Sequence, residues 1–158
     1  MPGVAIGLWG PAALLLLSAS AAGIGGAWHA HRRRIRDEIA GVAAELAERI
    51  AAAERIGQDA LACVSVLQTL QSVDPELLKV ERRGVCYLLS LVQAMGSAAA
   101  RAAPSGEPRS LPPLRQLVTT RREIRTYERR LQPIEQALHD HRTLLRHSAE
   151  VLARATAS

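Results

Sequence analysis

The sequence contains no phenylalanine, and its aromatic residues amount to only 3% of 158 residues. Enzymes usually line a substrate pocket with bulky apolar and aromatic side chains. The sequence also offers no nucleophile with a neighbouring base and no glycine-rich phosphate loop after a strand. We therefore expect a protein that is not an enzyme, and that takes no cofactor and no small-molecule substrate.

Cysteine is scarce as well. Cys63 and Cys86 form neither a C-x-x-C pair nor another zinc-type spacing. In a reducing compartment, two such thiols are best interpreted as small buried core residues. The histidines do not suggest a metal site either, because His139 and His141 point about 200° apart on a helix. The sequence predicts no metal site.

Charge is absent from the first 31 residues, and residues 4–28 form an uncharged, mainly apolar run. A helix of this length can cross the ~30 Å hydrocarbon core of a membrane. Trp9 and Trp28 lie about 28 Å apart along such a helix, so we expect one indole at each membrane interface. We therefore predict a transmembrane anchor over residues 1–31.

Arginines follow the run at once, whereas no lysine or arginine precedes it. This bias predicts that the N-terminus lies outside and the C-terminal helices lie in the cytoplasm. The same side chains can contact anionic lipid headgroups. The predicted basic interface residues are Arg32, Arg33, Arg34 and Arg36.

A cleaved signal peptide is the alternative interpretation of the run. Ala19, Ser20 and Ala21 fit a cleavage motif, and cleavage near Ala21 would release an exported helical-bundle protein in which a Cys63–Cys86 bridge becomes plausible. The run lacks a basic segment before it, and the arginines behind it would resist translocation. We favour the anchor.

Small residues recur at four-residue spacing in the second half of the run, for example at Ala19, Gly23 and Ala27. Such a face lets another transmembrane helix approach closely. An alanine-rich segment also produces these spacings by chance. Both interpretations stay open.

Residues 32–102 are expected to form an amphipathic segment of two helices, broken near residues 72–75, where Asp74 can cap the second helix. In the first helix, apolar residues recur at eleven-residue intervals, which predicts a nearly straight apolar stripe. Residues 85–92 of the second helix are apolar on nearly all sides. We expect the most buried part of the domain there.

Residues 103–113 contain four prolines and a glycine, which predicts a linker. Residues 114–158 predict one long helix with a coiled-coil tendency, and Pro133 falls off its packed face. The opposing heptad positions, such as Thr120 and His141, are poor for a leucine-zipper dimer. The packing residues recur every seven positions: Leu117, Ile124, Leu131, Leu138, Leu145 and Leu152.

Residues 37–101 carry a net charge of −3 and residues 114–158 a net charge of +4. An economical arrangement therefore folds the third helix back on the first two, although packing against another chain is the open alternative. One face of the third helix is basic. A basic stripe can bind nucleic acid or anionic lipid, but a solvated face paired with acids is the commoner outcome. Its residues are Arg115, Arg122, Arg125 and Arg129.

Together these features predict an all-α, single-pass membrane protein. Its expected role is that of an accessory subunit, scaffold or assembly factor that acts through helix packing. Its expected partners are membrane lipids and either other proteins or copies of itself. A membrane-tethered binder of anionic lipid, or less favourably of nucleic acid, is the second hypothesis, and the exported bundle is the third.

Overall fold

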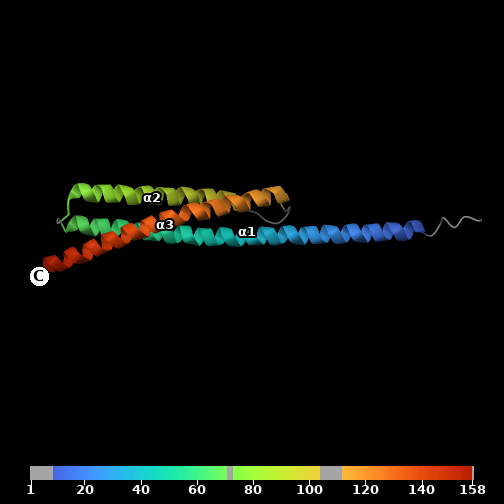
Figure 1. Cartoon of the computed structure of the whole chain (residues 1–158), viewed down its shortest axis with the longest axis horizontal. Coiled ribbons are helices and arrows are strands. Elements are labelled where there is room, and N and C mark those ends of the chain that lie inside the picture. Colours follow the sequence, from blue (N-terminus) through green and yellow to red (C-terminus); the bar gives the residue numbers. More distant parts are fainter. Residues whose placement is uncertain (1–8, 71–72, 104–111, 158) are drawn as a thin grey trace, which may run out of the picture.

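The computed structural model describes residues 9–70, 73–103 and 112–157, with side chains for residues 26–70, 73–103 and 112–156. It contains three helices, α1 (Trp9–Thr69), α2 (Pro75–Ala102) and α3 (Leu114–Ala157). These ranges hold no strand, and the predicted all-α class is confirmed. Figure 1 shows α2 and α3 lying along the C-terminal part of α1, whose N-terminal part projects beyond both.

The three helices run up, down and up. Arg121 near the start of α3 pairs with Glu38 of α1, and Glu135 further along α3 pairs with Arg49. The two helices are therefore parallel, and α2 is antiparallel to both. The proximal end of the bundle is the end where α2 stops and α3 begins, beside the projecting part of α1. The distal end is the opposite end, where α1 connects to α2. In this arrangement α3 packs within its own chain.

The core is one continuous cluster of apolar side chains from all three helices. In α3 each residue at seven-residue spacing from Leu117 to Leu145 is buried, whereas Leu152 is half-buried. Figure 1 shows the C-terminal end of α3 extending beyond the distal ends of the other helices, which explains the greater exposure of Leu152. The heptad spacing thus follows the line along which α3 lies against α1 and α2.

Helix α1 contacts α2 closely at a glycine. Gly57 is buried, and a Cβ atom placed on it would lie 2.7 Å from Cγ of Leu89. Ile39 and Ile50 of the predicted stripe are buried, but Leu61, the next in the eleven-residue series, is half-buried and its neighbour Ala60 is buried instead. Past Gly57 the stripe still buries Val64 and Leu67, so Leu61 alone turns towards the edge of the side that α2 and α3 cover.

Local signals define the helix ends. Asp74 caps α2 by accepting a hydrogen bond from the Glu76 amide at 2.9 Å, and Pro75 occupies the first helical position. Helix α2 ends at Ala102 and α3 begins at Leu114, so the helices stop on either side of the proline-rich stretch; its residues 104–111 lie outside the described residues. Pro133 lies inside α3 and is exposed.

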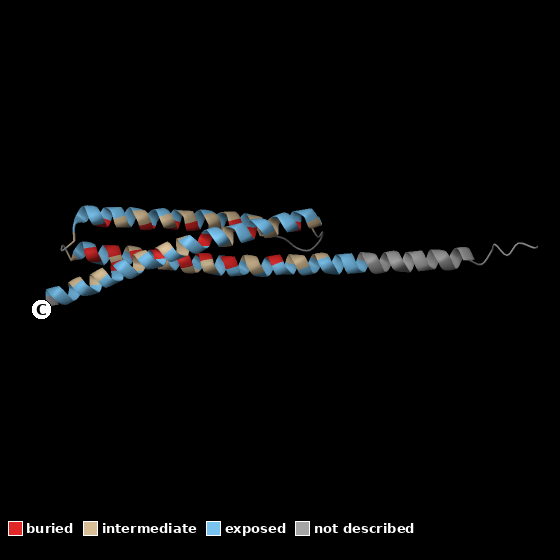
Figure 2. Cartoon of the chain, in the orientation of Figure 1, coloured by how far each residue is buried: buried red, intermediate tan, exposed pale blue. Residues whose placement is uncertain are grey.

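The burial of α2 differs from the prediction. Val85, Leu89 and Val92 are buried, but Cys86 is exposed and Tyr87 is 64% exposed. The expectation that residues 85–92 form the most buried part of the domain is wrong, because only one face of α2 packs against α1 and α3. Figure 2 shows the exposed side that results. The related expectation of two buried thiols is also wrong, since Cys86 is exposed and Cys63 is half-buried; both are free.

Candidate interaction surfaces

Residues 9–31 of the predicted anchor and the first helix of the predicted amphipathic segment belong to one unbroken helix, α1. Its residues 26–31 are all exposed, including Ala27 and Trp28, whose indole is 50% exposed. Of the arginines that follow, Arg33 and Arg34 are exposed, whereas Arg32 and Arg36 are half-buried. The side chains of Trp9, Ala19, Ala21 and Gly23 lie outside the described residues, as does the predicted cleavage motif.

Helix α2 is the described helix that is long and apolar enough to cross a membrane, judged by length and composition alone. Its apolar residues 85–92 alone are too few to cross a membrane, but the whole helix has 28 residues. Inserting it while it packs on α1 and α3 would take charged residues such as Arg49 and Glu135 towards the hydrocarbon, which is costly. The apolar character of α2 therefore needs another explanation.

An exposed apolar face runs along α2 on the side away from the core. Leu77, Val80 and Tyr87 are 54%, 61% and 64% exposed. Leu91 and Ala94 continue the same row, and residues 84–100 carry no charge. We call these five residues the outer α2 face. The sequence prediction missed it because an apolar arc wider than one core can cover was interpreted as complete burial.

A groove at the distal end adjoins this face. It has a volume of about 480 Å³ and is lined mainly by apolar side chains of α1, α2 and α3. Leu77 belongs to both the groove and the outer α2 face, while Leu144 and Val151 of α3 are 58% and 47% exposed on the other side. We call it the distal groove. Together the two surfaces form a continuous apolar region.

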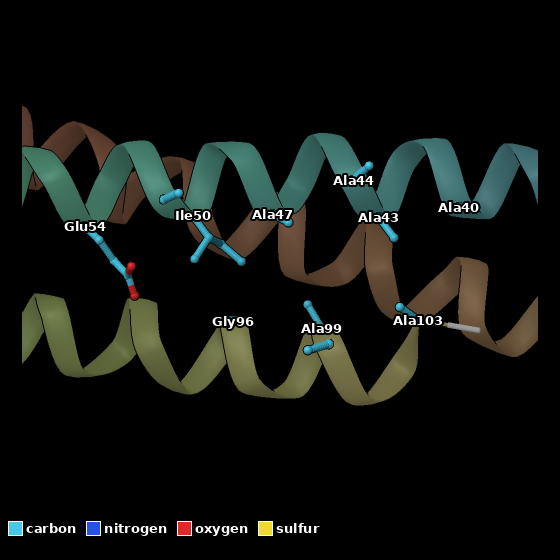
Figure 3. A pocket seen from close by; sticks show the side chains of 11 residues that line it. Ala40, Ala43, Ala44, Ala47, Ile50, Glu54, Gly96, Ala99 and Ala103 are labelled. Carbon is cyan, nitrogen blue, oxygen red and sulfur yellow. The ribbon is translucent and has the colours of Figure 1, made fainter. Parts of the chain in front are cut away.

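A second groove lies between α1 and α2 nearer the proximal end (Figure 3). It has a volume of about 440 Å³ and is lined by small residues, among them Ala43, Ala47, Gly96 and Ala99. In Figure 3 the Glu54 carboxylate lies at one end of the groove and the other labelled side chains are aliphatic. With one charged group, this groove offers no set of polar atoms that could position a reacting molecule.

Charged contacts fix the position of α3 on its neighbours. Arg49 meets Glu135 through two hydrogen bonds of 2.5 and 3.2 Å, and this bonding raises the pKa of Arg49 although partial burial opposes the change. His141 Nδ1 lies 2.8 Å from a carboxylate oxygen of Glu81. These side chains are engaged in helix packing, and in the described chain no three His, Cys, Asp or Glu side chains gather as a metal site would require.

The basic stripe on α3 is solvent-facing: Arg115, Arg122, Arg125 and Arg129 are all exposed. The neighbouring Arg121 is instead engaged with Glu38. The fold places the first part of this stripe at the proximal end, close to Arg32, whose guanidinium donates a hydrogen bond to the Pro112 carbonyl. Two arginine groups that are separate in the sequence therefore lie side by side.

Compared with protein-family models, with curated proteins and with solved structures, the chain matches none of them.

Proposed function

We propose that this chain is a non-enzymatic, single-pass membrane protein that serves as an accessory or scaffold subunit and binds a helix of a partner protein. The observation that carries the proposal is the outer α2 face. Monomeric soluble proteins rarely leave a long row of large apolar side chains uncovered, and such rows usually mark an interface. The distal groove extends this region onto α3.

The length and chemistry of the outer α2 face suit a helix. From Leu77 to Ala94 the row spans about 26 Å, which is roughly the length of a five-turn helix. Its residues are three, four or seven positions apart, so they lie on one side of α2 and form a ridge that can fit between the side chains of a facing helix. Since residues 84–100 carry no charge, the partner helix needs to be apolar along its contact face.

Membrane attachment is supported by the position of the uncharged run. Residues 9–28 of the run lie in the part of α1 that projects beyond α2 and α3 (Figure 1), and Arg32, the first arginine after the run, already contacts Pro112 next to α3. An apolar helix without protein neighbours is stable in lipid but poorly solvated in water. The arginine bias favours an external N-terminus and a cytoplasmic bundle.

Charge on the outer α2 face tests the proposal. We expect Val80→Glu with Tyr87→Glu to abolish stoichiometric co-purification of the partner from mild detergent, because two carboxylates would be buried without partners at the interface. The matched control, Gln93→Glu with Ser97→Glu, adds the same charge to exposed positions on the polar side of α2 and should retain the partner.

Circular dichroism is expected to show the same helix content in both variants, since all four positions are exposed. A partner that stays bound to the Val80/Tyr87 variant would contradict the proposal. If the co-purifying chain is a second copy of this protein, its intact mass identifies it as a homo-oligomer held by the same face.

A further inference from the structure

The fold brings together two arginine groups that lie about eighty residues apart in the sequence. Arg32 donates to the carbonyl of Pro112, directly before α3, and Arg121 of α3 pairs with Glu38 of α1. The first turns of α3 therefore lie beside residues 32–38 of α1. This contact is tertiary, and nothing in the local sequence pattern of either helix predicts it.

The proximal end of the bundle is strongly positive. Residues 32–38 and 114–125 together contain eight arginines and three acidic residues. At the distal end, residues 54–69, 74–83 and 140–157 together contain seven basic and seven acidic residues. The net positive charge of the bundle is thus concentrated at the end from which the uncharged part of α1 projects (Figure 1).

The distances suit contact with lipid headgroups. Arg32 follows Trp28 by four residues, or about 6 Å along α1, and the headgroup layer is about 5–8 Å thick on each side of a membrane. Arg115 lies at about the same height along the bundle as Arg32, because Pro112, three residues before Arg115, accepts a hydrogen bond from Arg32. Arg125 adjoins Ile39 and Val42, about 17–21 Å beyond Trp28 on an upright helix.

We propose that Arg115 and Arg122 of α3 join Arg32, Arg33, Arg34 and Arg36 of α1 in one arginine collar that binds the phosphates of anionic phospholipids. The inference rests on the membrane attachment proposed above. Arg115 contributes directly, and Arg122 contributes when the bundle tilts towards the side of α3. The collar thereby sets the tilt of the bundle and the direction in which the outer α2 face is presented to a partner.

The test uses the full chain reconstituted in vesicles. In a Trp9→Phe variant Trp28 is the sole tryptophan, and its fluorescence quenching by brominated phosphatidylglycerol, relative to brominated phosphatidylcholine, reports the preference for anionic lipid beside the collar. We expect a clear anionic preference that weakens with added salt. Arg115→Glu with Arg122→Glu should lower it at least fivefold, because a single arginine near a charged surface contributes a factor of about five.

Two variants control for the change in net charge and for folding. Arg82→Glu with Arg83→Glu makes the same reversal at exposed positions of α2 near the distal end and should leave the preference unchanged. Arg115→Gln with Arg122→Gln should lower it by a smaller factor. Neither Arg115 nor Arg122 lies in the core, so helix content is expected to stay constant in all variants.

An unchanged preference in the Arg115/Arg122 variants would overturn the collar and leave the α1 arginines to act alone. The collar would also be overturned if the Arg115/Arg122 variants kept the preference for anionic lipid but lost binding to single-stranded RNA. These arginines would then serve nucleic acid instead of lipid. Failure of the proposed anchoring is distinguishable from both results, because Trp28 would then be quenched by neither brominated lipid.

Discussion

Gly57 is the residue on which the close packing of α1 and α2 depends. It is buried, and an added methyl group would overlap the buried side chain of Leu89. Gly41 is also in α1 but has open space where a Cβ atom would lie. The two glycines therefore have the same backbone conformation and opposite tolerance to a side chain.

We expect Gly41→Ala to stabilise the bundle by about 0.5–1 kcal/mol, because alanine is the better helix former. Gly57→Ala gains the same propensity, but overpacking against Leu89 opposes it by about 1–3 kcal/mol. Urea unfolding in mild detergent, followed by circular dichroism, measures the difference between the variants. Equal stabilisation by both substitutions would show that α2 does not approach α1 at Gly57.

Arg49 gives a prediction about pH. Its bonding to Glu135 raises its pKa in the folded state, so the stabilisation it provides is complete below the unfolded-state pKa and is lost only as pH rises through the higher folded value. Both values lie in strongly alkaline solution. Arg49→Ala should therefore cost the same free energy of unfolding at pH 7 and pH 9, about 0.5–1 kcal/mol for a partly exposed pair. A cost that disappears by pH 9 would contradict this assignment.

At the level of single residues, periodicity predicted much of the interior. The seven-residue series of α3 and the positions of Ile39 and Ile50 are on the buried side of their helices. The sequence pattern did not predict the exposure of Cys86 and Tyr87. Whether an apolar side chain is buried depends on how many neighbours surround its helix, and this number is a property of the whole bundle.

Among the elements, α3 carries a proline in its interior. Pro133 cannot donate a backbone hydrogen bond to the carbonyl of Arg129, and it is exposed, so no packing contact in the core compensates for this loss. We expect Pro133→Ala to raise the free energy of unfolding by about 1–3 kcal/mol. Gln132→Ala, at the neighbouring exposed position, should change it by less than about 0.5 kcal/mol. A destabilised Pro133→Ala variant would indicate that the bundle requires a bend at this point.

The ends of the elements were predictable because they depend on local chemistry. Asp74 and Pro75 start α2, and the prolines of the connecting stretch exclude a continuous helix between α2 and α3. The outer α2 face was not predictable in the same way. An apolar arc that wide is equally compatible with a central helix of a larger bundle and with a peripheral helix that awaits a partner.

For the whole molecule, the direction of α3 could not be derived from the sequence. The charge balance favoured packing of α3 on α1 and α2, but it did not place Arg115 beside Arg32. Arg115 comes to lie beside Arg32 because α2 is long enough to bring the chain back to the proximal end, where α3 then begins. The proposed collar therefore depends on the tertiary structure.

The native cysteines report the orientation of the whole molecule. Cys86 is exposed on the bundle, so a membrane-impermeant maleimide should label it in inside-out vesicles but not in intact cells. Cys86→Ser should remove most of the signal, because the remaining thiol, Cys63, is half-buried and therefore less accessible to the maleimide than Cys86. Labelling in intact cells would place the bundle outside and reverse the proposed topology.

Membrane attachment through the projecting part of α1 is the central claim, and the intact mass of the protein in carbonate-washed native membranes tests it most directly. We predict a full-length chain in the membrane pellet, since carbonate removes peripheral proteins but not a helix that spans the hydrocarbon. A chain shortened by about 21 residues in the soluble fraction would contradict the claim and would support the exported bundle instead.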